Sequence, residues 1–192
     1  MFETLFIALL VSAPELRCVN EGYVGSAVAV DLEGDGKWAI TAKHCIKKPK
    51  GKIELHCFDD GVYYTCKARV YCVSDNHDVC LLEVLECDCE WKTVKLADIG
   101  YEYNKGLVVE SWGCAHGRDP DKRTHKIVKE LDNVILDTEN TIGRSGGPLY
   151  SPEGKLIGIA STSTVGSWEV DNVVLPHSCD YVSVKGIWSL FR

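Results

Sequence analysis

The chain has 192 residues, 45% of them hydrophobic and 26% charged, which suits one large globular domain or two smaller ones and excludes a disordered or fibrous chain. Its net charge of -7 comes with no basic run longer than residues 47–50, so we expect no nucleic-acid partner. The cysteine count, 10, is high and even, but the clustered spacing reveals no pairing.

The chain begins with an apolar segment, residues 2–13, interrupted only by Glu3 and Thr4. This segment is too short to span a bilayer alone, and no basic residue precedes it. A signal peptide, an N-terminal strand and the stub of a membrane segment from a longer precursor therefore remain open, and so does contact with a membrane.

From Gly22 onward, short apolar or alternating runs are separated by glycine-rich turns, a pattern typical of β-strands. Residues 25–30 and 38–41 predict a hairpin around the turn at 31–36. Further strands are predicted at 53–58, 62–73, 79–84, 94–97, 107–112, 127–136, 149–150, 155–161, 173–174 and 181–184. This spacing indicates an all-β barrel or sandwich, with helical turns only at 42–47 and 187–191.

Residues 86–92 are polar and do not alternate, so they predict the connection between two halves of the molecule. The resulting division has an apolar N-terminal segment at 1–17, a first half at 18–90 and a second half at 91–192.

A single serine, Ser145, is surrounded by glycines in the stretch 141–149. Glycines allow a tight, partly left-handed turn that exposes the hydroxyl and lets backbone N–H groups converge on one point, as an oxyanion hole requires. The pattern predicts a nucleophile. It also fits the nucleophile elbow of the α/β-hydrolases, so a partner histidine and a carboxylate must decide between the two folds.

Two upstream residues supply those partners. His44 follows an apolar strand at a strand-to-helix corner, and Asp78 stands at the entrance of another apolar strand. A lone histidine or a strand-end aspartate is more often structural, but together with Ser145 they run in the order His, Asp, Ser. An α/β-hydrolase needs its acid and histidine after the serine.

These three motifs, at 41–45, 78–82 and 143–149, resemble those of the chymotrypsin-like (trypsin-like) serine peptidases, and the resemblance covers residues 22–190. It implies an all-β fold of two antiparallel six-stranded β-barrels, with the active site between them and a short C-terminal helical turn. The barrel at 18–90 would carry the histidine and aspartate, and the barrel at 91–192 would carry the serine and the specificity pocket.

The resemblance also implies roles for individual residues. His44 would act as general base, Asp78 as the acid that orients it, and Ser145 as nucleophile, with the N–H groups of Gly143 and Ser145 as the oxyanion hole. The substrate would be a polypeptide.

Specificity residues follow from the same resemblance. Ser161, Thr162 and Ser163 match the strand that pairs with an extended substrate. Glu139 stands where family members set the base of the primary pocket, so a preference for Lys or Arg, as in a secreted trypsin-like protease, is one alternative. An exposed glutamate in a polar run is the other.

The chain departs from the digestive members of that family at Arg144, where they carry an aspartate that pairs with a freed N-terminus. Activation of that type is not expected. The compact length and the serine motif look more like RNA-virus polyprotein proteases or HtrA-type protease domains. Both a secreted protein and a viral product inside a host cell therefore stay open, as does the oligomeric state.

Some viral members carry a structural zinc, and Cys87, Cys89, Cys114 and His116 could supply four ligands here. The order differs from those members, in which the second pair follows the nucleophile, so no cofactor is expected and the zinc remains an alternative. A binding module that keeps the scaffold without turnover is the competing function.

Overall fold

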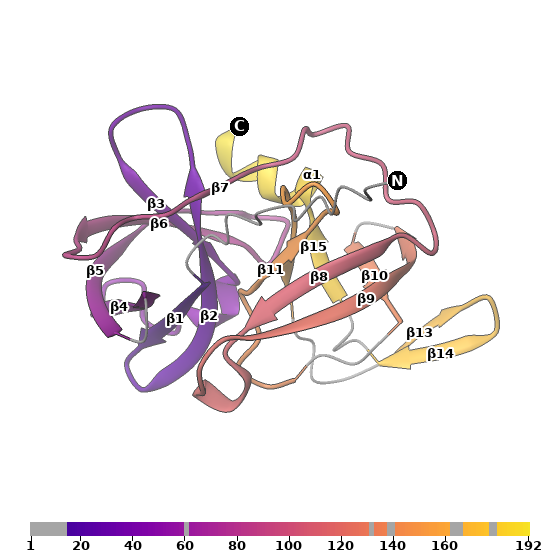
Figure 1. The fold of residues 1–192 in the computed structure, drawn as a ribbon, viewed down its shortest axis with the longest axis horizontal. Coiled ribbons are helices and arrows are strands. Elements are labelled where there is room, and N and C mark those ends of the chain that lie inside the picture. Colours follow the sequence, from indigo (N-terminus) through magenta and orange to yellow (C-terminus); the bar gives the residue numbers. More distant parts are fainter. Residues whose placement is uncertain (1–14, 60–61, 131–132, 138–140, 162–166, 177–179) are drawn as a thin grey trace, which may run out of the picture.

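The computed structural model describes residues 15–59, 62–130, 133–137, 141–161, 167–176 and 180–192. Two strand barrels lie side by side, and the C-terminal helix lies against them at the top of the view (Figure 1). The predicted all-β fold of two six-stranded antiparallel barrels with a short C-terminal helix is confirmed.

The first barrel contains the N-terminal strands. The strand order β1-β4-β5-β6-β3-β2 closes through pairing of β1 with β2, and β7 adds a short parallel pairing to β2. Its elements are β1 Glu15–Asn20, β2 Tyr23–Asp31, β3 Lys37–Thr41, η1 Lys43–Cys45, β4 Ile53–Asp59, β5 Val62–Val73, β6 Cys80–Glu86 and β7 Val94–Lys95.

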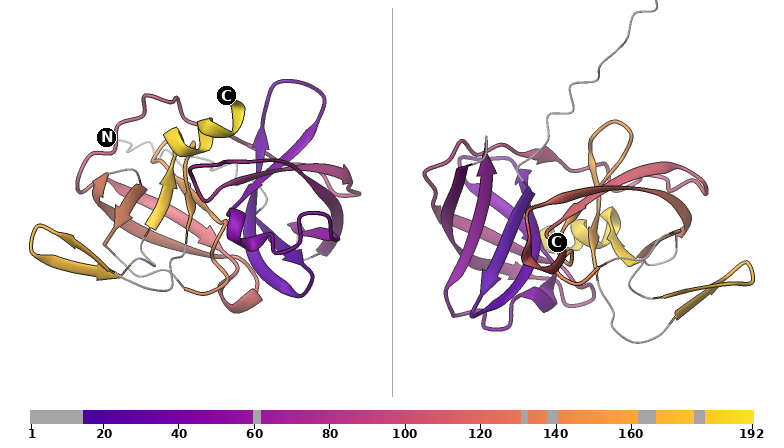
Figure 2. Two further views of the ribbon diagram at one scale, coloured as in Figure 1. Left: turned by 180° about the vertical axis from the view of Figure 1, so that it is seen from behind. Right: turned by 60° about the horizontal axis from the view of Figure 1, so that its bottom comes forward.

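The second barrel closes in the order β10-β15-β12-β11-β8-β9, and a separate hairpin, β13 with β14, projects away from it (Figure 2). Its elements are β8 Val108–Gly113, η2 Ala115–Gly117, β9 Asp121–Glu130, β10 Asn133–Leu136, β11 Pro148–Tyr150, β12 Leu156–Ala160, β13 Ser167–Val170, β14 Val173–Pro176, β15 Asp180–Ser183, α1 Val184–Trp188 and η4 Ser189–Phe191.

Strand β2 shows why the two barrels pack together. Its successive side chains point to opposite faces, so Ala27 and Ala29 enter the interior of the first barrel while Val28 and Val30 pack against the second. Strand β12 does the same from the other side, because Ile159 joins this interface core and the next residue, Ala160, faces into the second barrel. The wall between the barrels is therefore apolar on both faces.

Strand β9 differs from the sequence prediction, which placed one strand at 127–136. The structure has a hairpin there, β9 and β10, and β9 begins earlier, at Asp121. Its first residues are polar, and only His125 and Ile127 in this strand are buried. Because one face of the strand meets solvent, the period-2 apolar signal is weak there.

Strand β1 was also missed as a regular element. The expected strands started from Gly22, whereas β1 runs from Glu15 to Asn20 and pairs with both β2 and β4. Among the described residues, no helix is long and apolar enough to cross a membrane.

Tyr103 ties the connection between the barrels to the second barrel. Its buried hydroxyl donates a hydrogen bond to the Ile157 carbonyl at 2.5 Å and accepts one from the Val184 N–H at 2.7 Å, at the start of α1. The Trp188 indole N–H adds a bond to the Ala97 carbonyl at 3.0 Å. The connecting segment and the C-terminal helix therefore stabilise each other.

Replacing Tyr103 with Phe should lower the free energy of unfolding by about 1–3 kcal/mol, because it leaves the buried Val184 N–H without its partner. Urea titration followed by circular dichroism measures this loss. Tyr71→Phe, at a ring that is 61% exposed, is the control and should change little. Equal effects of the two substitutions would contradict the role given to Tyr103.

Candidate active site

A short helical turn and a loop bring His44 and Asp78 together. Thr41 ends β3, η1 follows and carries His44, and Asp78 stands just before β6, which pairs with β3. The His44 ring atom Nδ1 lies 2.6 Å from Asp78 Oδ2, and the His44 backbone N–H donates to Oδ1 at 2.9 Å. A carboxylate has no proton to give, so in the neutral imidazole Nδ1 carries the proton and Nε2 is the acceptor.

The surroundings of this pair shift both pKa values. Burial opposes the charged imidazolium, but the hydrogen bonds and charge interactions with Asp78 and Cys45 together outweigh it and raise the pKa of His44 to about 10. Burial also opposes the Asp78 carboxylate, yet the His44 ring and N–H and the Ser161 hydroxyl, at 2.8 Å, together lower its pKa. Asp78 is therefore ionised at neutral pH.

In the loop around Ser145, two backbone N–H groups point away from hydrogen-bonded carbonyls of the same loop. The Ile142 carbonyl accepts the His116 N–H at 2.8 Å, and the Arg144 carbonyl accepts the Gly147 N–H at 2.9 Å. In a trans peptide the N–H points opposite to the carbonyl, and no peptide bond among the described residues is cis. The N–H groups of Gly143 and Ser145 therefore point away from these two bonds.

Two glycines in this loop meet conditions that no other residue fits. Gly143 has φ +91° and Gly146 has φ +86°. A Cβ on Gly143 would lie 2.5 Å from the Cys114 carbonyl oxygen, and one on Gly146 would lie 2.0 Å from the Ser26 carbonyl oxygen. The glycine pattern in the sequence therefore reflects close backbone contacts as well as the turn.

Ser26 on β2 joins this loop to the first barrel. Its N–H donates to the Ser145 carbonyl at 2.7 Å, and its buried hydroxyl donates to the Gly143 carbonyl and accepts the Cys114 N–H, both at 2.8 Å. Sequence reasoning noted Ser26 only as part of a strand. A buried serine in an apolar strand was the signal that could have singled it out.

A pocket of about 340 Å³ lies between the two barrels, beside His44 and Ser145. His44 contributes from the first barrel, and Gly143 and Ser145 contribute from the second, so the structure brings these predicted residues to one cavity. The remaining lining residues are Tyr23, Val24, Lys47 and Ile142.

The predicted specificity residues are only partly described. Ser161 lies at the end of β12, where its hydroxyl contacts Asp78 and its N–H donates to the Asp180 carbonyl at 3.0 Å. Its side chain therefore supports the histidine-aspartate pair. Glu139, Thr162 and Ser163 lie outside the described residues.

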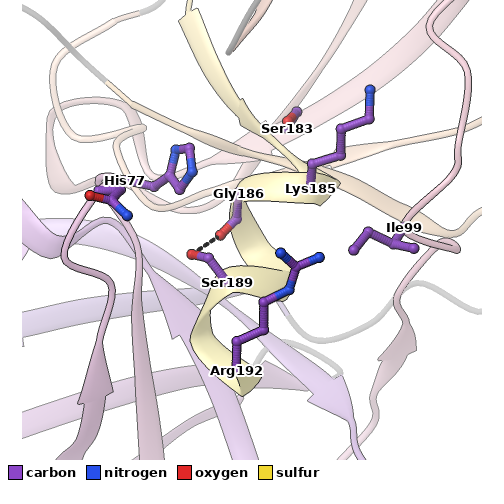
Figure 3. Close-up of a pocket in the computed structure, with 8 residues that line it drawn as sticks. His77, Ile99, Ser183, Lys185, Gly186, Ser189 and Arg192 are labelled. Atoms are coloured by element: carbon purple, nitrogen blue, oxygen red, sulfur yellow. Dashed lines mark hydrogen bonds between the residues drawn. The ribbon is translucent and has the colours of Figure 1, made fainter.

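Behind the pair lies another pocket, of about 710 Å³, lined by basic and polar side chains of the loop before Asp78 and of the C-terminal helix (Figure 3). The Ser74 and Ser189 hydroxyls lie 2.8 Å apart, and a Cβ on Gly186 would come within 3.1 Å of the His77 ring. The C-terminal helical segment therefore packs against the loop that carries Asp78 and stabilises it. This pocket is lined by Asn76, His77, Ile99, Ser183, Lys185, Gly186, Ser189 and Arg192.

The cysteines named for a zinc site do not gather as that set. Cys87 forms a disulfide with Cys66, and Cys89 Sγ lies 3.1 Å from Cys87 Sγ. In the described part of the chain, this group of three sulfurs is the metal-binding candidate, and Cys114 and His116 lie instead beside Gly143. Within the residues that the structure describes, the four predicted ligands therefore do not gather as one group, and the clustered sulfurs are those of Cys66, Cys87 and Cys89.

We expect a disulfide between Cys66 and Cys87 with Cys89 reduced, checked by peptide mapping of alkylated, non-reduced protein. Changing both Cys66 and Cys87 to Ser should lower the free energy of unfolding by about 3 kcal/mol, because the crosslink restricts the unfolded chain. A chelator should leave the melting temperature unchanged. Stoichiometric zinc, with destabilisation on its removal, would contradict this expectation.

Because Asp78 contributes to the raised pKa of His44, Asp78→Asn should lower that pKa below its wild-type value. The imidazole should then lose its proton at lower pH. NMR titration of the ring Cε1–H measures this change. His56, whose pKa burial lowers, titrates in the same spectra as an internal control and should not move. An unchanged pKa of His44 would show that Asp78 does not cause the shift.

Comparison with known proteins adds two findings. The model of the trypsin-like peptidase domain family matches residues 25–159, a span that contains His44, Asp78 and Ser145. No sequence among the curated proteins matches the chain.

Solved structures of similar fold include a serine endoprotease from Yersinia pestis, at TM-score 0.68 and 19% identity, with 90% of this chain and 59% of that chain covered. An inactive mutant form of Rv3671c from M. tuberculosis H37Rv matches at TM-score 0.71 and 12% identity, covering 93% and 84%. Deg5 matches at TM-score 0.71 and 16% identity, covering 92% and 86%. At these identities the likeness shows the fold.

The chain spans 59% of the length of the Yersinia endoprotease. The family match is independent of that length and covers most of this chain. The chain therefore belongs to the family of trypsin-like peptidase domains.

Proposed function

We propose that this chain hydrolyses peptide bonds through a triad of His44, Asp78 and Ser145 and a covalent acyl-enzyme. The observation that carries the proposal is the hydrogen-bonded His44–Asp78 pair, whose histidine lines the same pocket as Ser145. A nucleophile, its base and the group that orients the base are the parts that acyl transfer needs.

In the first step, which requires His44 in its neutral form, Ser145 Oγ attacks the scissile carbonyl while His44 Nε2 takes the hydroxyl proton. The ionised Asp78 stabilises the imidazolium through its bond to Nδ1. His44 then gives that proton to the leaving amine, and the C–N bond breaks to leave the acyl group on Ser145. A water, deprotonated by the same histidine, attacks the ester, and the acid product leaves with Ser145 restored.

The tetrahedral oxygen would be held by the N–H groups of Gly143 and Ser145. The Ile142 and Arg144 carbonyls, which are bonded away from that point, support this role. Such preorganised donors are usually the largest electrostatic contribution in sites of this kind.

Finer points stay predictions. An extended polypeptide would pair by strand addition with the backbone at 161–163, and a preference for Lys or Arg depends on Glu139. The viral polyprotein role is a proposal that rests on chain length and motif style alone. A profile of cleavage sites in a peptide library tests the preference for Lys or Arg.

Ser145→Ala should abolish labelling by a fluorophosphonate probe and reduce peptide cleavage by about 10⁶-fold, because the nucleophile is lost. His44→Ala should do the same to cleavage. Gel fluorescence and a quenched peptide substrate measure the two effects. Ser167→Ala, at an exposed serine on β13, is the matched control and should behave as the wild type.

Folded wild-type protein that neither labels nor cleaves at neutral pH would overturn the proposal. That outcome would favour the competing function, a binding module that keeps the scaffold without turnover.

A further inference from the structure

We propose that Arg144 is a positioning residue that holds the oxyanion-binding turn in its active shape, so that the folded chain needs no liberated N-terminus. This inference rests on the proposed function. Arg144 lies between Gly143 and Ser145, the two predicted oxyanion donors, and its exposed fraction is 0%. A fully buried arginine next to a nucleophile requires an explanation, because an unpaired buried charge is strongly unfavourable.

The guanidinium is anchored on two neighbouring strands of the second barrel. Its Nη1 forms an ion pair with Asp121 Oδ1 and donates to the backbone carbonyls of Asp121, at 3.1 Å, and Gly113, at 3.4 Å. Gly113 on β8 and Asp121 on β9 are directly paired in the sheet. The guanidinium of Arg144 therefore contacts the paired ends of β8 and β9.

The other nitrogen continues into a buried polar chain. Arg144 Nη2 donates to Ser111 Oγ at 2.9 Å, and Ser111 Oγ lies 2.7 Å from His125 Nε2. The Ser111 hydroxyl therefore links the guanidinium to the imidazole of His125. Burial and then the nearby Arg144 charge lower the pKa of His125 to about 4, so the imidazole is neutral and adds no second charge to this chain.

This anchoring reaches the reactive turn through the backbone of Arg144. A Cβ on Gly113 would lie 3.0 Å from Arg144 Cα, so the residue is packed directly against β8. The Arg144 N–H donates to the Thr141 carbonyl at 3.1 Å, and its carbonyl accepts the Gly147 N–H at 2.9 Å. Fixing this Cα limits the rotation of the 144–145 peptide plane, which carries the Ser145 N–H, and of the 143–144 plane, which adjoins Gly143.

The arrangement reverses the charges expected from the digestive members. There the residue before the serine is an anion that waits for a terminal ammonium. Here the loop carries the cation, and its anion, Asp121, is supplied by the scaffold of the same chain. The turn can therefore take its shape without a terminal ammonium.

The test compares Arg144→Ala, Arg144→Lys and Asp121→Asn with the wild type. The control is Arg69→Ala, which breaks an exposed arginine–glutamate pair on β5 and β6 far from the serine loop. Readouts are kcat and KM for a peptide, the fraction of protein that reacts with a fluorophosphonate, and the melting temperature.

Arg144→Ala removes the guanidinium and should lower kcat by about 100-fold or more, the size of effect seen when one oxyanion donor is lost. KM should change by less than about threefold. The reactive fraction should fall in parallel. Millimolar guanidinium should restore part of the kcat of this variant alone, since the ion can occupy the vacated site. Arg144→Lys and Asp121→Asn should fall between Arg144→Ala and the wild type, and Arg69→Ala should match the wild type.

The results separate this inference from the proposed function. Wild-type protein without activity would defeat the proposed function. If the wild type is active and a folded Arg144→Ala keeps the wild-type kcat, only the positioning role is overturned. The same conclusion follows if kcat falls only in proportion to the melting temperature and guanidinium does not restore it. If Arg144→Ala does not fold, Asp121→Asn decides, because its carboxylate is 45% exposed and its replacement should leave the fold intact. An unchanged kcat in that variant would overturn the inference.

Discussion

Ser26 shows the constraint on which the rest of this molecule depends: the nucleophile loop belongs to the second barrel but is held by hydrogen bonds to the first. The bond from the Ser26 N–H to the Ser145 carbonyl, at 2.7 Å, and that from its hydroxyl to Gly143 cross the interface between barrels. Each buried group in such a contact must find a partner, since an unmet one costs more than the bond contributes. The two barrels can therefore pack closely in only one relative position, and that position sets His44 opposite Ser145.

Two charge pairs, each partly buried, act on the two halves of the site. Asp78 receives donors from His44 and Ser161 and keeps the imidazole in one tautomer, while Arg144 and Asp121 keep the neighbouring turn in shape. Neither pair needs to contribute much to overall stability, because the cost of removing charges from water largely offsets their attraction. Such pairs provide a defined geometry. Asp78 fixes it on the histidine side of the cleft, and we infer that Arg144 fixes it on the serine side.

The apolar wall between the barrels explains which elements were predictable. Strand β2 is buried on both faces, so its apolar run was read correctly from the sequence. Strand β9 meets solvent on one face, and its polar first half hid both its start and the turn into β10. The glycines at 143 and 146 were recognisable, because a positive φ and close backbone contact exclude other residues.

By itself, the sequence determined the barrel fold, the order of His44, Asp78 and Ser145, and the fact that a cation replaces the usual anion at Arg144. Each of these depends on residue type and on spacing along the chain, which are visible in one dimension. Only the tertiary structure decided what Arg144 contacts, that Ser161 supports Asp78, and that Cys87 joins Cys66 rather than Cys114. Those partners are far apart in the sequence. No local pattern along the chain therefore reveals the contacts between them.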